Sequence, residues 1–293
     1  MQTTTCHSDI GKIETVFIKN ATHAFINTAH INNYWQQLNF LSNVHFDTAV
    51  KEYTNFEKAL TQLGATLYYF DADDTVNMDA IYCRDASIAT DKGMIICNMG
   101  KALRKNEPAA QKKAFEKMGI PILGVIEAPG TVEGGDVAWL DANTLAVGHT
   151  YRTNEVGIMQ LTKLLQPLNV QVITVDLPHY KGVNDVFHLM SIYSPIDTNK
   201  AVVYSPLMPI TFRNLLISKG YQLIEVPDNE FETMGCNVLA LAPSNCLMVS
   251  GNPITEKRIK DAGCIVTTYI GNEISVKGGG GPTCLTRPMQ RCI

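Results

Sequence analysis

The sequence predicts an α/β protein, because short apolar runs of strand-like composition alternate with helical patterns from one end of the chain to the other. These segments follow one another closely, and no linker or low-complexity tract separates them. A chain of 293 residues could hold one large domain or two ordinary ones. The unbroken alternation favours a single α/β domain over residues 1–293.

The first half of the chain contains two predicted helices. Apolar residues from Ala49 to Leu63 are spaced to share one face, which predicts a helix over 47–63 that ends at Gly64. A second helix is predicted over 107–118. Apolar runs around these helices predict strands at 14–18, 66–70, 80–83, 94–97 and 122–126.

The second half continues the same alternation. A hairpin is predicted from strands at 137–140 and 144–147, which a short polar turn joins. Asn154 is the expected N-cap of a helix over 154–165, because its side chain can accept from a first-turn N–H. The remaining elements are helices at 211–218 and 255–262 and strands at 170–175, 201–204, 221–226, 238–242 and 264–269.

The composition argues against nucleic acid and membranes as partners. The formal net charge is −4, and no long basic stripe is present. The short cationic cluster of Lys101, Arg104 and Lys105 is interpreted as an exposed helix face. The N-terminus lacks the pattern of a signal peptide, and no apolar stretch approaches the roughly 20 residues that span a bilayer.

Eight cysteines are scattered along the chain and form no C-x-x-C pair. This spacing argues against a zinc ribbon and a thioredoxin-type motif. A disulfide framework is not expected, because the chain is long and cysteine is not dense. The pattern favours a reducing, cytoplasmic setting in which Cys97 and Cys246 are small buried apolar residues.

The strongest chemical signal is a glycine-rich loop before a cysteine near the C-terminus. Gly278 to Gly281 precede Pro282, Thr283 and Cys284. Consecutive glycines are costly to order, so they suit a place where the backbone approaches a ligand closely or takes a positive φ. Cys284 would then be accessible and surrounded by amide donors. The alternative is a mobile glycine loop beside an unremarkable cysteine.

A second signal is a glycine pair between two acids, Glu133-Gly134-Gly135-Asp136, at the start of a predicted strand. The glycines allow a sharp turn there, and the two carboxylates could face a cationic substrate. Two solvated acids in an ordinary loop are the alternative.

A third signal is His188, which lies between apolar neighbours. A cysteine enzyme needs a proton shuttle that titrates near neutrality, and histidine supplies one. None of the other six of the seven histidines has a comparable context. The alternative is a hydrogen-bonded histidine of the core.

Two arginines provide weaker signals. Asp79 precedes the strand predicted at 80–83, and the Arg84-Asp85 pair follows it. The pair either belongs to a site or is a surface ion pair of little energetic value. Arg152 precedes a predicted helix, and it could bind a carboxylate in bidentate fashion or be an exposed helix-start residue.

Taken together, these segments resemble the guanidino-group-modifying superfamily of arginine deiminases, dimethylarginine dimethylaminohydrolases, agmatine deiminases and amidinotransferases. The resemblance covers roughly residues 8–291, and the ordered set is more specific than any single motif. The matching segments, in the order of that superfamily, are Arg84-Asp85, Glu133 to Asp136, Arg152-Thr153-Asn154, His188-Leu189, Asn237 to Leu241 and Cys284-Leu285-Thr286.

The resemblance implies a five-bladed α/β propeller with pseudo-fivefold symmetry and a central active site that needs no metal or other cofactor. It implies that Cys284 is the nucleophile, His188 the general acid and base, and Glu133 the carboxylate that orients the histidine or holds the guanidinium. Asp85 would bind the guanidinium nitrogens, and Arg152 would bind a substrate carboxylate. The remaining expected substrate-binding residues are Asp79, Arg84 and Asp136.

The implied reaction is hydrolysis of a guanidino or amidine compound. A bound guanidinium would favour ionisation of Cys284, whose thiolate attacks the central carbon and forms a covalent thiouronium. Water would release a ureido product such as citrulline. Met190 stands where many relatives carry a second acid, and dimethylarginine dimethylaminohydrolases also lack an acid there. An N-substituted guanidine, or a less highly charged amidine, is therefore expected rather than free arginine.

Two other functions stay open at this stage. An amidinotransferase would pass the amidine from Cys284 to an amine, and a non-catalytic member of the fold would only bind a small guanidino ligand. The segment over 21–39, with Tyr34 and Trp35, could be a lid or simply pack on the core. The sequence also leaves a homo-oligomer open.

Overall fold

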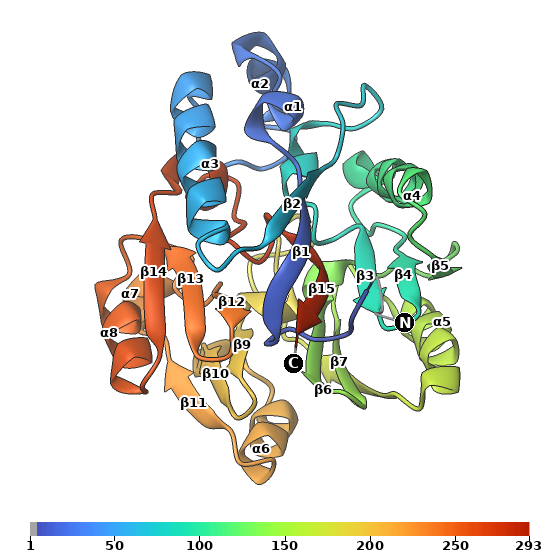
Figure 1. The fold of residues 1–293 in the computed structure, drawn as a ribbon, viewed down its shortest axis with the longest axis vertical. Coiled ribbons are helices and arrows are strands. Elements are labelled where there is room, and N and C mark those ends of the chain that lie inside the picture. Colours follow the sequence, from blue (N-terminus) through green and yellow to red (C-terminus); the bar gives the residue numbers. More distant parts are fainter. Residues whose placement is uncertain (1–4, 293) are drawn as a thin grey trace.

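Five three-stranded sheets form a ring in the computed structural model, which describes residues 5–292 (Figure 1). In every sheet, the middle strand pairs antiparallel with one neighbour and parallel with the other. This repeated unit gives the ring pseudo-fivefold symmetry. The expected five-bladed α/β propeller is therefore confirmed.

Each blade takes its strands from one stretch of the chain, except the first, which combines the two ends. In order around the chain, the blades are β15 (Arg287–Cys292), β1 (Lys12–Ile18) and β2 (Thr66–Tyr69); β3 (Ser87–Thr90), β4 (Gly93–Ile96) and β5 (Ile122–Val125); β6 (Val137–Asp141), β7 (Thr144–His149) and β8 (Gln171–Asp176); β9 (Tyr193–Asp197), β10 (Lys200–Val203) and β11 (Gln222–Glu225); and β12 (Leu239–Ala242), β13 (Asn245–Val249) and β14 (Ile265–Tyr269).

A helix connects the two parallel strands of every blade, because parallel neighbours need a long crossover. These helices lie on the outside of the ring (Figure 1). They are α3 (Phe46–Leu60), α4 (Glu107–Lys117), α5 (Glu155–Leu165), α6 (Ile210–Ser218) and α8 (Pro253–Asp261). Three shorter helices are also present. α1 (Ala21–Ala24) and α2 (Thr28–Tyr34) precede α3 in the crossover from β1 to β2, and α7 (Asp228–Phe231) lies between β11 and β12.

The C-terminal strand closes the ring. β15 pairs antiparallel with β1, with Pro288 opposite Val16 and Arg287 opposite Phe17. Because β15 follows Cys284 by only a few residues, this pairing anchors the cysteine loop to the first blade.

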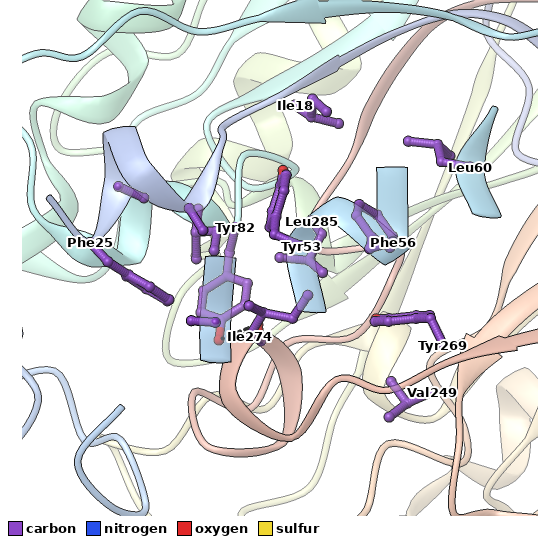
Figure 2. Packing of buried hydrophobic residues seen from close by; sticks show 14 of the residues in the cluster. Ile18, Phe25, Tyr53, Phe56, Leu60, Tyr82, Val249, Tyr269, Ile274 and Leu285 are labelled. Carbon is purple, nitrogen blue, oxygen red and sulfur yellow. Dashed lines mark hydrogen bonds between the residues drawn. The ribbon is translucent and has the colours of Figure 1, made fainter. Parts of the chain in front are cut away.

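The largest hydrophobic cluster connects α3 to the residues around the cysteine (Figure 2). The ring of Phe56 lies 5.0 Å from that of Tyr269. Leu285 and Tyr82 belong to the same cluster, and the side chain of Cys284 packs against it. Burying such aromatic and aliphatic groups contributes about 1.5–3 kcal/mol each, so the packing of the core also fixes the surroundings of the sulfur.

Most predicted elements are present within a residue or two of their expected ends, including the 137–147 hairpin and the Asn154 cap, whose side chain accepts from the Gly157 N–H. The strand predicted at 80–83 is wrong. A 3-10 turn over Met78–Ile81 occupies this region, and the Asn77 side chain starts it by accepting from the Asp79 N–H.

Four strands, β3, β9, β13 and β15, lie outside the predicted set. They are short partners of neighbouring strands and are mostly buried, so their sequences show little of the alternation that identifies a half-exposed strand. Among residues 5–292, the structure has no helix with both the length and the apolar character needed to cross a membrane.

Candidate active site

A cavity of about 140 Å³ lies among the loops that connect the blades. Cys284 and His188 both line it, although they are far apart in the sequence. Asp85 and Arg152 also line this cavity, whereas Glu133 lies directly behind the imidazole. The fold thus brings the thiol, the imidazole and the carboxylates to one place.

The glycines before Cys284 are closely packed. A Cβ atom on Gly278 would lie 1.9 Å from the Tyr82 hydroxyl oxygen, and one on Gly280 would lie 2.5 Å from the Tyr82 ring. Gly279 has a φ of +73°, which side chains rarely adopt. The loop therefore needs glycine for close approach and for backbone conformation. This supports the first interpretation of the motif, in which the backbone approaches a ligand closely or takes a positive φ.

The sulfur of Cys284 is partly buried and accepts a hydrogen bond of 3.2 Å from Asn237 Nδ2. Burial and the negative charge of Asp85 raise the pKa of the Cys284 thiol to about 12, despite the opposing hydrogen bond from Asn237. At neutral pH the cysteine of the ligand-free site is therefore protonated.

The imidazole of His188 is held by Glu133, whose Oε2 lies 2.8 Å from His188 Nε2. Burial lowers the pKa of His188, but the charges of Asp136, Asp85 and Glu133 outweigh it and raise the pKa to about 9. Burial also opposes ionisation of Glu133, yet the contact with His188 and the charge of Arg152 hold its pKa at about 2. The pair is thus an imidazolium and a carboxylate at neutral pH.

The glycine pair beside Glu133 is explained by contacts with these groups. A Cβ atom on Gly135 would lie 2.3 Å from His188 Nδ1, and one on Gly134 would lie 2.2 Å from the Arg84 carbonyl oxygen. Only glycine lets the turn pass this close to the imidazole.

Asp136 does not line the cavity, which corrects its expected place in the substrate-binding set. Its Oδ1 accepts from the Leu189 N–H at 3.0 Å, and its Oδ2 accepts from Thr150 Oγ1 at 2.7 Å. Burial raises the pKa of Asp136 to about 6. The side chain therefore fixes the backbone next to His188 from behind.

Arg104 is buried, so the interpretation of Lys101, Arg104 and Lys105 as an exposed face is wrong. Arg104 Nη1 lies 2.6 Å from Asp85 Oδ2, and its Nε and Nη2 donate to Glu107 at 2.8 Å each. Desolvation and the contact with Arg104 act in opposite directions on Glu107, and burial prevails, which raises its pKa to about 7.

The ion pair of Asp85 with Arg104 occupies only one of the two carboxylate oxygens. Asp85 Oδ1 has no hydrogen-bond partner among residues 5–292, and it lies 3.9 Å from His188 Nδ1. Asp85 is thus a buried acid with one oxygen available to a ligand, and not half of a surface pair.

The three other expected substrate-binding residues differ in their surroundings. Arg152 lines the cavity, donates to the Asp185 carbonyl at 3.3 Å and has its Nη1 3.6 Å from Glu133 Oε2. Asp79 also lines it but is paired with Lys101 at 2.6 Å.

Arg84 also lines the cavity, although its guanidinium is paired inside the protein, and its expected contact with a substrate stays a prediction. Its Nη2 donates to Asp9 Oδ1 at 2.8 Å, and both side chains are buried. The backbone N–H of Arg84 donates to the Cys284 carbonyl at 3.1 Å, so this residue helps to hold the cysteine loop.

The segment over 21–39 contacts the cavity at its C-terminal end. Leu38 and Asn39 line the cavity, and the Leu38 carbonyl accepts from Lys101 Nζ at 2.9 Å. Tyr34 and Trp35 pack against the large hydrophobic cluster. The side chains singled out in the sequence therefore have packing contacts, while the residues after them face the cavity.

Three side chains of the site have donor atoms close enough together to bind a metal cation. Asp85, Glu133 and His188 each offer one ligand atom, and these atoms lie within 4.8 Å of one another. However, protein cations already contact both carboxylates, and His188 is protonated at neutral pH. This arrangement suits an organic cation that donates hydrogen bonds, and the metal-free site stays a prediction.

The fold and this set of side chains define a protein of the guanidino-group-modifying superfamily. The family model described as "N,N dimethylarginine dimethylhydrolase, eukaryotic" matches residues 20–291. The chain belongs to this family, which supports a guanidino-group hydrolase.

Two relatives and one solved structure are similar to this chain over most of its length. The uncharacterized protein YkgA of Bacillus subtilis is 26% identical over 288 residues, which cover 98% of this chain and 96% of that protein. The N(G),N(G)-dimethylarginine dimethylaminohydrolase of Streptomyces coelicolor is 29% identical over 216 residues, or 73% of this chain and 76% of that protein. The structure of DDAH from Pseudomonas aeruginosa in complex with citrulline matches with a TM-score of 0.76 at 19% identity and covers 94% of this chain and 98% of that one.

Proposed function

We propose that this protein hydrolyses the guanidino group of an N-substituted, arginine-like compound through a covalent intermediate on Cys284. The observation that carries the proposal is the cavity that Cys284, His188 and Asp85 line together, with Glu133 bonded to the imidazole. The products would be an amine or ammonia and a ureido compound such as citrulline.

The charges at the site support a reaction that the substrate itself starts. Cys284 is protonated at rest, because burial and Asp85 raise its pKa to about 12. A guanidinium bound between Cys284 and Asp85 would favour the thiolate by direct electrostatic attraction, and the thiol proton would leave to solvent. The cysteine would therefore become nucleophilic only when a substrate is bound.

The protonated imidazole then has a definite task. Attack of the thiolate on the guanidinium carbon forms a C–S bond and a neutral tetrahedral adduct. His188 gives its proton to the departing amine as the C–N bond breaks, which leaves a cationic thiouronium on Cys284 and a neutral imidazole. Water attacks next, and His188 takes one of its protons. Collapse of the second adduct breaks the C–S bond and releases the thiolate and the ureido product, while the remaining hydroxyl proton leaves to solvent.

The surroundings of the guanidinium favour a substituted substrate. Asp85 offers one free oxygen, and Met190, which is buried in the cavity wall, offers none. A site with fewer hydrogen-bond acceptors pairs fewer N–H groups of the guanidinium. Replacing one N–H by an alkyl group therefore leaves fewer acceptors unpaired than it would in a site with a second acid. Arg152 is the proposed partner of a substrate carboxylate.

A substrate panel tests the proposal. Arginine, methylated and acylated arginines and simple alkylguanidines are incubated with the protein, and release of ammonia or amine is measured together with the ureido product. We expect substituted arginines to be preferred, with a mass increase on Cys284 after acid quench. Cys284→Ala should abolish both signals. A clear preference for free arginine would contradict the substrate class.

The same assay separates the alternatives. An amidinotransferase would turn over only with an added amine acceptor, and a binding protein would show saturable binding without product. We further propose that residues 1–293 form one catalytic domain with a small-molecule partner. The eight free thiols, with Cys292 exposed, favour a reducing cytoplasmic compartment.

A further inference from the structure

Asn237 connects the fifth blade to the cysteine loop through both ends of its side-chain amide. Its Oδ1 accepts from the Thr283 N–H at 3.1 Å, and its Nδ2 donates to Cys284 Sγ at 3.2 Å. The side chain is buried in the cavity wall, just before β12. One side chain therefore contacts both the nucleophile and the residue that precedes it.

The orientation of the amide follows from its partners. The Thr283 N–H is a donor and needs an acceptor, so Oδ1 must face it. Nδ2 is then the only end of the amide that can face the sulfur, and it is a donor. The sulfur of Cys284 therefore meets an N–H group, which favours a thiolate over a thiol.

Close packing holds this amide in place. A Cβ atom on Gly281 would lie 2.6 Å from Asn237 Oδ1 and 2.8 Å from Asn237 Cβ. The backbone N–H of Asn237 donates to the Met234 carbonyl at 3.1 Å. The last glycine of the loop is thus required so that the amide can lie against the loop backbone.

The other groups around the sulfur set the background for this contact. Burial and Asp85 disfavour the Cys284 thiolate, while Arg84 and the Gly281 N–H favour it. The hydroxyls of Tyr82 and Tyr269 stay neutral, because burial raises the pKa of both. His188 lines the same cavity as a cation. Among residues 5–292, Asn237 is the one side chain that donates a hydrogen bond to this sulfur.

We propose that Asn237 is a catalytic residue that stabilises the Cys284 thiolate and directs the sulfur toward the substrate. The inference rests on the proposed function, in which Cys284 is the nucleophile. The amide would donate to the sulfur both in the thiolate that attacks the substrate and in the thiolate that leaves when the second adduct collapses.

The test compares Asn237→Asp with the unaltered protein. Asp keeps the volume and the acceptor for the Thr283 N–H but replaces the donor with a second carboxylate oxygen. The rate of iodoacetamide alkylation at Cys284 is followed from pH 7 to pH 10, below the pKa of the thiol, by peptide mass spectrometry. We expect this rate to fall about 10- to 100-fold across the range, because the donor to the thiolate is lost and a carboxylate charge is placed beside the sulfur. Turnover should fall about 10- to 100-fold at neutral pH.

Two further arms keep the test decisive. Asn199→Asp changes an exposed asparagine of the β9–β10 turn and should leave the alkylation profile unchanged. In the unaltered protein, the side-chain amide resonances of Asn237 should shift in NMR spectra when a bound guanidinium compound causes Cys284 to ionise. This second measurement needs no variant and holds even if Asn237→Asp does not fold.

The outcomes distinguish this inference from the proposed function. A folded Asn237→Asp protein with the original alkylation profile would overturn the role of Asn237, as would amide resonances that ignore the ionisation of Cys284. Failure of every guanidino compound to modify Cys284 in the unaltered protein would instead overturn the proposed reaction, whatever the profile of the variant shows.

Discussion

The two sides of the cavity carry opposite states of charge. On one side, His188 and Glu133 form a buried ion pair at 2.8 Å, and Arg104 neutralises one oxygen of Asp85. On the other side, Cys284 is held as a neutral thiol by burial. The charged side is complete before a substrate arrives, whereas the thiol side needs a cation to ionise. The difference fits the proposed reaction, in which the site becomes reactive when a substrate binds.

Removal of the thiol is the most severe test of this comparison. Cys284→Ala should lower turnover by about 10⁴-fold or more, because no other group can form the covalent intermediate. Binding of a product such as citrulline, measured by calorimetry, should persist because the charged side is intact. Residual turnover near the original rate would show that the thiol side is not the reactive one.

Loss of the Glu133 carboxylate on the charged side should have the next largest effect on turnover. Glu133→Gln should lower turnover by about 10²- to 10³-fold, because the imidazole loses the carboxylate that keeps it protonated and oriented. Steady-state kinetics check this effect. Asp176→Asn provides a matched control, since it breaks an exposed pair with His149 of similar length, 3.0 Å, and should change turnover little.

Replacement of the buried Arg104 tests whether this cation stabilises the charged side of the cavity. Arg104→Met should lower the free energy of unfolding by about 3–5 kcal/mol, because Asp85 and Glu107 are left without their shared cation. Urea denaturation measures this change. Lys105→Met, at an exposed neighbouring position, should stay within about 0.5 kcal/mol of the original protein. Equal effects of the two substitutions would mean that Arg104 is not a structural cation.

The pH dependence of stability should show the smallest effect. The pKa of His188 is raised from 6.5 to about 9, so its ion pair contributes stability that is fully present below pH 6.5 and is lost as the pH rises through about 9. We expect a loss of about 1–3 kcal/mol over this window. Urea titrations at pH 6.5 and 9.5 measure it. His188→Asn should remove this part of the pH dependence, and an unchanged slope would exclude His188 as its source.

The repeated blade shows how far local sequence patterns reach. Crossover helices such as α3 and α5 were predictable, because each has an apolar face, a cap or a terminal glycine within a few residues. Strands such as β3 and β13 were not, because they are short and buried on both faces. Their place is decided by the neighbouring strand and not by their own periodicity.

For the charged residues of the site, local sequence patterns also predict only part of what the structure shows. Motif order was enough to single out Cys284, His188, Glu133 and Asp85, which the fold brings together around one cavity. The cationic cluster predicts an exposed face for Arg104, although the spacing of Arg104 from Glu107, three residues away, indicates pairing.

The sequence by itself determined the alternation of helices and strands and the chemical groups available to the site. Both depend on neighbouring residues and on their order. Only the tertiary structure decided which charges are desolvated and with which partners they pair. Asp136 supports the backbone beside His188, and Arg84 binds Asp9 inside the protein, because the packing of separate blades sets these distances. Desolvation depends on that packing, and no spacing along the chain encodes it.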